Sequence, residues 1–329
     1  MDLEQWATLS NNMVAAATVV FGLACVAHLL EWSSSRRVDV AAPVAAEAKV
    51  PVGADSRLRD SGASETDPDS RDPAIAGERS ERFGRIGVGL TVLAAGCLLV
   101  GVVSRGFAAE RVPWGNMYEF ATAGLLVVVA IYLGLVRLMH AQWLGGVITG
   151  FAVCVLGLAF LAYVPAGPLV PALDSYWLVL HVSAAAVAGG AFTVGAGASI
   201  FYLVKSRAER DTPEDKRVGY LWRLPSSAAI DQLAYRVHAF AFPVWTFAAL
   251  IAGPIWAEHA WGRYWGWDPK EVWAFITWVV YAGYLHARAT AGWRGKAAAV
   301  IALVGFATFL FDFIGVNLIA SGQHTYSGL

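Results

Sequence analysis

Apolar runs of about 20 residues recur along this chain, and they limit its fold more than any other feature. A helix that spans a membrane needs about 20 mostly apolar residues. The chain is 57% hydrophobic and only 15% charged, which excludes an ordinary water-soluble enzyme. We therefore expect an all-α integral membrane protein, a polytopic helical bundle of about eight transmembrane helices. Their predicted positions are 12–31, 86–104, 118–138, 144–163, 177–204, 237–256, 271–287 and 297–319.

The distribution of basic residues predicts the orientation of this bundle. If the first residue lies outside the cytoplasm, 20 of the 24 Lys and Arg residues fall in inner segments. Only Arg105, Arg111, Arg263 and Lys270 then fall in outer segments. Because basic residues accumulate on the cytoplasmic side of membrane proteins, we expect both termini to be extracytoplasmic.

Residues 33–85 differ in composition from the rest of the chain. They are rich in Ala, Pro, Ser, Asp and Arg, and they contain few large apolar residues. Such a segment cannot bury a core, so we expect a disordered cytoplasmic loop. This loop separates a first transmembrane helix at 1–32 from a membrane domain at 86–329.

Several kinds of chemistry find no support in the sequence. There is no Walker motif and no G-x-G-x-x-G motif followed by a ribose-binding acid, so we expect neither nucleotide nor nucleic acid as a ligand. Cys25, Cys97 and Cys154 lie within apolar runs and form no C-x-x-C motif. A disulfide scaffold, a structural zinc site and a thiol relay within this chain are therefore not expected.

Seven of the 14 tryptophans lie between Trp245 and Trp278, and the densest part is a predicted outer loop at 256–271. An interfacial aromatic belt explains one or two tryptophans at a helix end. It does not explain glycines interleaved with several aromatic rings. We interpret the loop as a platform for a flat, largely apolar, aromatic ligand, on which rings stack while glycines let the backbone come close. Its aromatic members are Trp261, Tyr264, Trp265 and Trp267.

The end of this loop also predicts a helix start. Asp268, Pro269 and Glu271 have the spacing of an N-cap, a first helical proline and the third residue of a capping box. Capping does not exclude a role in binding. Arg263, Lys270 and the N–H groups of the helix start could form a cationic site for the carboxylates of an otherwise apolar ligand.

The histidines fall into two layers along the predicted helices. His181 and His324 lie at the outer level of the tryptophan loop, whereas His286 and His238 lie at the inner ends of their helices. Imidazole is a common metal ligand, and ionisable residues at membrane depth are candidates for function. Two outer histidines beside an aromatic platform would suit an iron porphyrin, which needs two axial nitrogens. We expect His28 and His140 to be interfacial, and His259 to be either an alternative ligand or without a role.

The segment from Trp256 to Arg288 resembles the tryptophan-rich WWD signature of the haem-handling CcsA/CcmC/CcmF family of cytochrome c biogenesis, and the match is closest to CcsA. The similarity extends over residues 86–329 through three further motifs. These are R-V-P-W-G-N-M-Y-E at 111–119, S-Y-W-L-V-L-H at 175–181 and G-Q-H-T-Y at 322–326.

The resemblance implies specific roles for these residues. His181 and His324 would be the axial ligands of an outer haem b, the loop at 261–271, with Asp268, would hold the haem edge, and His286 would belong to an inner haem site. In this family the inner site is completed by a Ccs1/ResB-type membrane protein, although His238 could also supply the second ligand. His238 departs from the family pattern, which usually has an apolar residue there.

The resemblance also implies a function. The pair of proteins would act as a holocytochrome c synthase of system II in a bacterial plasma membrane, carrying haem outward and attaching it to the CXXCH motifs of apocytochromes c. Thiol-reducing relay proteins would be further partners. Two other functions stay open from the residues: a bis-haem cytochrome b that passes electrons from quinol, and a transporter of another aromatic solute, which would bind no haem.

Overall fold

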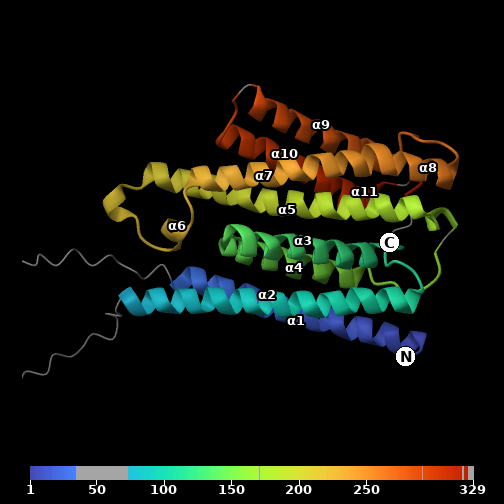
Figure 1. The fold of residues 1–329 in the computed structure, drawn as a ribbon, viewed down its shortest axis with the longest axis horizontal. Coiled ribbons are helices and arrows are strands. Elements are labelled where there is room, and N and C mark those ends of the chain that lie inside the picture. The colour runs from blue at the N-terminus through green and yellow to red at the C-terminus, as the bar shows by residue number, and fades with distance from the viewer. Residues whose placement is uncertain (35–72, 170, 291, 321, 325–329) are drawn as a thin grey trace, which may run out of the picture.

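The computed structural model describes residues 1–34, 73–169, 171–290, 292–320 and 322–324. These residues form helices and connecting loops and contain no strand. The long helices run along one common direction in layers, from α1 and α2 at one edge to α9 and α10 at the other (Figure 1). The predicted all-α membrane bundle is therefore confirmed, whereas its orientation in the membrane stays a prediction.

Seven described helical segments are long and apolar enough to span a membrane. Their largest contact is between the first two helices, and α5 packs on α3, α7 and α10 at the centre of the bundle. The segments are α1 (Leu3–Ser34), α2 (Pro73–Ala109), α3 (Met117–Met139), α4 (Gly145–Leu161) with the preceding turn η2 (Gln142–Leu144), α5 (Tyr176–Asp211), the unit α7 (Ser227–Thr246), η5 (Phe247–Ala252) and α8 (Gly253–Trp261), and the unit α10 (Lys296–Leu310), η6 (Phe311–Gly315) and α11 (Val316–Ile319).

Helix α9 (Pro269–Ala289) is the eighth predicted span, and it forms a helix of 21 residues as expected. It is not among the seven segments that are apolar enough, because its Trp and Tyr residues and His286, together with Lys270, Glu271 and Arg288, lower its mean hydropathy. Three short helical turns, η3 (Pro171–Leu173), η4 (Glu214–Lys216) and α6 (Tyr220–Arg223), lie in the connections.

Two of the long units contain a π-helical segment. In η5 and η6 the backbone hydrogen bonds skip one residue further than in an α-helix. Such segments occur often at functional sites, because they redirect side chains and change which backbone groups are free. Here both segments border the same cavity, described below.

Two sequence predictions fail near the other edge of the bundle. Helix α2 begins at Pro73, so the predicted loop at 33–85 is wrong for its last 13 residues; residues 35–72 lie outside the described part. The helix continues because it packs along α1, where the Ser80 hydroxyl donates to the Glu31 carbonyl oxygen. His28 was expected at an interface but is fully buried, with Nδ1 3.1 Å from a Glu31 carboxylate oxygen. Gly87 and Gly145 leave the room that its ring occupies.

Candidate functional site

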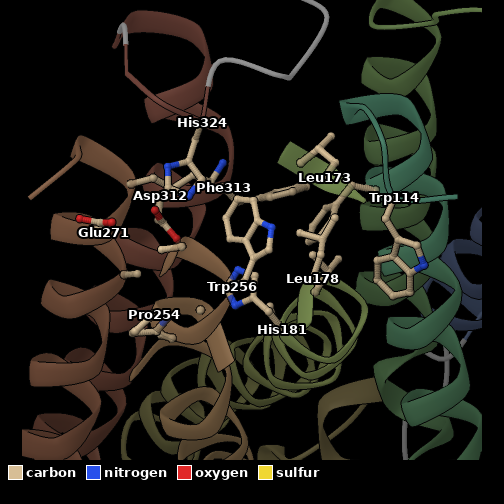
Figure 2. Close-up of a pocket in the computed structure, with 18 of the residues that line it drawn as sticks. Trp114, Leu173, Leu178, His181, Pro254, Trp256, Glu271, Asp312, Phe313 and His324 are labelled. Carbon is tan, nitrogen blue, oxygen red and sulfur yellow. The ribbon is translucent and has the colours of Figure 1, made fainter. Parts of the chain in front are cut away.

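A cavity of about 190 Å³ lies at the end of the bundle where α8 turns into α9, and we call it the outer pocket. Its walls come from the start of α3, the turn η3, the first turns of α5, the unit η5–α8, the start of α9, and η6 (Figure 2). Residues far apart in the sequence, from Trp114 to His324, thus meet here. The lining includes Trp114, Leu173, Leu178, His181, Trp256, Trp261, Tyr264, Trp265, Lys270, Glu271, Asp312, Phe313 and His324.

His181 enters this pocket from the second turn of α5, which Ser175 caps by accepting a hydrogen bond from the Trp177 N–H. The Nδ1 atom of His181 lies 2.9 Å from the carbonyl oxygen of Ala248. That carbonyl also accepts the π-helical hydrogen bond from Gly253. A Cβ atom at Gly253 would lie 3.1 Å from both groups, so glycine is required for this close approach.

His324 reaches the pocket from the segment after α11. Its Nδ1 atom lies 3.0 Å from Oδ2 of Asp268, and the backbone N–H of Gln323 donates to Oδ1 of the same carboxylate at 3.0 Å. Burial alone would raise the pKa of Asp268, but these hydrogen bonds hold that pKa below its ordinary value. Asp268 is therefore ionised and orients the imidazole of His324.

The two histidines share one chemical arrangement. A carbonyl or carboxylate oxygen can only accept, so each Nδ1 carries a proton. In the neutral form of each imidazole the lone pair is then on Nε2. This is how proteins orient metal-binding imidazoles. Within the described residues, no three His, Cys, Asp or Glu side chains gather into a metal-binding group. Two imidazoles suit an iron that is already held in a macrocycle.

Tryptophans separate and support the two imidazoles. The ring of Trp256 stacks on His181 with centroids 5.9 Å apart, and its centroid lies 5.6 Å from that of His324. In Figure 2 the indole of Trp256 lies between both histidines. Trp261 packs edge-on against His324 at 4.8 Å. Pockets for drug-sized ligands have volumes of about 300–1,000 Å³, so this pocket must widen before it can hold a macrocycle.

The other predicted platform residues divide into two groups. Trp265 lines the pocket and Tyr264 lines it at the exposed rim, whereas Trp267 is 69% exposed and does not line it. Trp267 has a φ of 58°, a left-handed conformation that is strained for a bulky residue. His259 is exposed and bonds through Nδ1 to the Ile255 carbonyl oxygen. It does not line the outer pocket.

The predicted capping box forms, and it changes the predicted cationic site. Glu271 accepts hydrogen bonds from the N–H groups of Gly266 and Asp268, so these amides of the helix start are engaged. Lys270 lines the pocket and donates to Oδ1 of Asn317 at 2.9 Å. Arg263 is exposed and donates to Oε1 of Gln323 at 2.8 Å.

A buried ion cluster supports the wall of the pocket at residues 114–116. Glu119 is fully buried and accepts hydrogen bonds from Arg105 at 2.9 Å, from Arg111 at 2.7 Å and from the Gly115 N–H at 2.8 Å. Since the cluster holds two guanidinium groups and one carboxylate, it carries net positive charge. It fixes the loop that bears Trp114.

The inner histidines are not brought together. His238, on α7, is completely buried among the rings of Phe192, Tyr281 and Tyr284, and neither of its ring nitrogens has a hydrogen-bond partner among the described residues. His286, near the end of α9, is exposed on the surface of the bundle. His238 lies about three turns inside α7, which begins at Ser227, and therefore not at the helix start that the sequence predicted. The two histidines face different environments.

Sequence reasoning missed several pocket residues. Leu173 and Phe313 look like ordinary apolar residues in the sequence, and Trp114 belongs to the motif at 111–119 but received no role there. Asp312 was missed although it carries a signal, because it is the one acidic residue in the apolar run 297–319. The π-helical segments had no sequence signal.

Comparison with known proteins identifies a family that includes the residues of the outer pocket. Residues 93–324 match the protein family described as Cytochrome C assembly protein. The chain is 35% identical over 263 residues to the cytochrome c biogenesis protein CcsA of Guillardia theta, covering 74% of this chain and 86% of that protein. It is 32% identical to CcsA of Porphyra purpurea over 295 residues, covering 78% and 91%.

A cyanobacterial relative and a solved structure point to the same family and fold. CcsA of Synechococcus sp. (strain JA-3-3Ab) is 32% identical over 296 residues, covering 74% of this chain and 84% of that protein. The fold resembles that of a cytochrome c haem lyase, CcmF, with a TM-score of 0.62 and 16% identity, covering 94% of this chain and 46% of the other. At that identity the likeness shows a shared fold.

Proposed function

This chain belongs to the cytochrome c assembly family and thus serves cytochrome c maturation, and within that role we propose that its outer pocket holds haem b for attachment to apocytochromes c. One observation carries the proposal most strongly. Two imidazoles from distant parts of the chain border one pocket, and each is held through Nδ1, while Nε2 has no hydrogen bond to any described residue. Haem is the substrate here, delivered and then handed on.

In the proposed reaction this chain acts by positioning. His181 and His324 bind the iron, while Trp256, Trp261 and Trp265 contact the macrocycle. The vinyl groups are thereby held in one orientation for the thiols of a CXXCH motif, and the histidine of that motif replaces one axial ligand. The three cysteines of this chain are free and lie away from the lining, so the thiols come from the substrate.

We further propose that His286 contributes to a second haem site at the inner end, completed by a Ccs1/ResB-type membrane partner. The exposure of His286 supports this, because a partner helix can approach it. His238 is less suited, since aromatic rings fill its surroundings. An electron-transfer cytochrome b with two haems would need a second pair of histidines that face each other. The inner histidines face different environments, so they do not favour that alternative function. Thiol-reducing proteins would keep the substrate cysteines reduced.

The proposal is tested by measuring covalent haem on a CXXCH reporter in cells that carry this chain and its partner. We expect His181→Ala and His324→Ala each to lower both outer-site haem and reporter yield. The matched control is His259→Ala, an exposed histidine near the loop that does not line the pocket. Unchanged yield in both pocket variants would contradict the assignment.

A further inference from the structure

Asp312 is a buried acid in the wall of the outer pocket to which the proposed function assigns no role. It lies in the π-helical segment η6 and is 5% exposed. Its Oδ1 atom has no hydrogen-bond partner among the described residues. Figure 2 shows its carboxyl group between Glu271 and Trp256, at the pocket. A buried polar atom without a partner is costly, and in a membrane protein it indicates function.

The neighbouring carboxyl groups are already engaged. Glu271 holds the N–H groups of the loop before α9, and Asp268 holds His324 and Gln323. Lys270, the nearest cation, donates to Asn317, and it attracts Asp312 without forming a hydrogen bond to it. Among the carboxyl groups that line the pocket, Asp312 is therefore the one available to accept or donate a proton.

Charge distribution indicates which edge of a haem would face Asp312. On the Asp312 side, three carboxyl groups (Asp268, Glu271 and Asp312) outnumber two cations, the partly buried Lys270 and the exposed Arg263. The opposite wall at Gly115 packs directly on the Arg111 guanidinium, part of the net positive cluster. Propionates are anionic and are thus favoured at the 114–116 wall. The vinyl edge then faces Asp312.

We propose that Asp312 carries the proton during thioether formation, an inference that rests on the proposed function. The Asp312 carboxylate accepts the proton as the S–H bond of a substrate cysteine breaks. The thiolate sulfur forms a bond to the vinyl carbon next to the ring, the C=C π bond breaks, and the terminal vinyl carbon becomes a methyl group by receiving that proton. No net oxidation or reduction occurs. General acid–base groups of this kind contribute about 10²–10⁴-fold to a rate.

The test compares three proteins: the parent protein, Asp312→Asn and Asp312→Glu. Each is the full chain, loaded with haem and coexpressed with its partner. Attachment to a CXXCH reporter is followed over time at several pH values, and bound haem is measured by its spectrum. We expect Asp312→Asn to keep the bound-haem spectrum but to attach haem at least about 100-fold more slowly. The attachment rate of Asp312→Asn should also no longer increase with pH, because the amide cannot act as a base as a carboxylate does. Asp312→Glu should restore part of the rate and of that rise.

Two results would overturn the inference. One is an Asp312→Asn variant that attaches haem at the parental rate. The other is a loss of bound haem that parallels the loss of rate. It would show that Asp312 supports haem binding, as a neighbour of Lys270, and does not transfer a proton. Asp211→Asn, an exposed acid at the far end of α5, is the matched control and should change neither readout. Failure of the proposed function would instead appear as no attachment by the parent protein.

Discussion

The histidines at the two ends of this bundle have different surroundings. At the outer end, His181 and His324 are each held through Nδ1, and both border one pocket. At the inner end, His238 is enclosed by aromatic rings and His286 is exposed on the surface. Among the described residues, two histidines therefore border one pocket at the end of the bundle where α8 turns into α9, and no such pair forms at the other end. In the proposed function, a membrane partner supplies what the other end lacks.

The largest expected effect comes from the buried cluster behind the outer pocket. Glu119→Leu leaves Arg105 and Arg111 without a carboxylate, and breaking a buried pair costs about 3–5 kcal/mol. We expect a lower thermal unfolding temperature in detergent and loss of outer-site haem. Glu214→Leu, at a 90% exposed side chain near the inner end, is the control. A parental unfolding temperature for Glu119→Leu would show that the cluster does not support the outer end.

Asp268→Ala removes the carboxylate that orients His324. Loss of such a supporting group typically lowers metal affinity about 10–100-fold. Haem titration of the purified protein should show a weaker outer site. Asp174→Ala, at an exposed acid in an outer loop, should leave the affinity unchanged. Equal affinity in both variants would mean that His324 is held by something other than Asp268.

Gly253→Ala tests how tightly the other imidazole is placed. The added methyl group would lie 3.1 Å from His181 Nδ1 and from the Ala248 carbonyl oxygen, so the ring must shift. We expect about a tenfold loss of haem affinity, at the lower end of effects on supporting groups. Gly283→Ala is the matched control, because no atom lies within 4 Å of its added Cβ. A normal affinity for Gly253→Ala would show that the π-helical segment is adaptable.

The smallest effect is expected at the inner end. His238→Leu replaces an imidazole whose nitrogens have no partner by an apolar side chain in an aromatic environment. Such exchanges are close to neutral or stabilising, within about 1 kcal/mol. Unfolding temperature and haem content should both stay near the parental values. A marked loss of haem would assign His238 to the inner haem site after all.

The sequence predicted what depends on local pattern. Apolar runs located the helices, and the capping box placed the start of α9 correctly. The resemblance named His181 and His324, and the structure brings both to one pocket; their role as haem ligands stays a proposal.

The rest depends on packing between distant segments. The acceptor for His181 is the Ala248 carbonyl oxygen, which lies in a π-helical segment and also accepts from the Gly253 N–H. No residue type in the sequence specifies that position for a carbonyl. His28 is buried because two glycines on other helices make room, which no pattern along its own helix reveals. The sequence places Trp256 at the start of the predicted loop at 256–271, but in the fold its ring lies between the two histidines (Figure 2).

The most direct test is the optical spectrum of the purified chain after haem loading without its partner. The three proteins compared are the parent, the double variant His181→Ala/His324→Ala and the single variant His286→Ala. The account predicts a low-spin haem spectrum in the parent and in His286→Ala, and its loss in the double variant. A low-spin spectrum that persists in the double variant would contradict the claim that the outer pocket is a complete haem site.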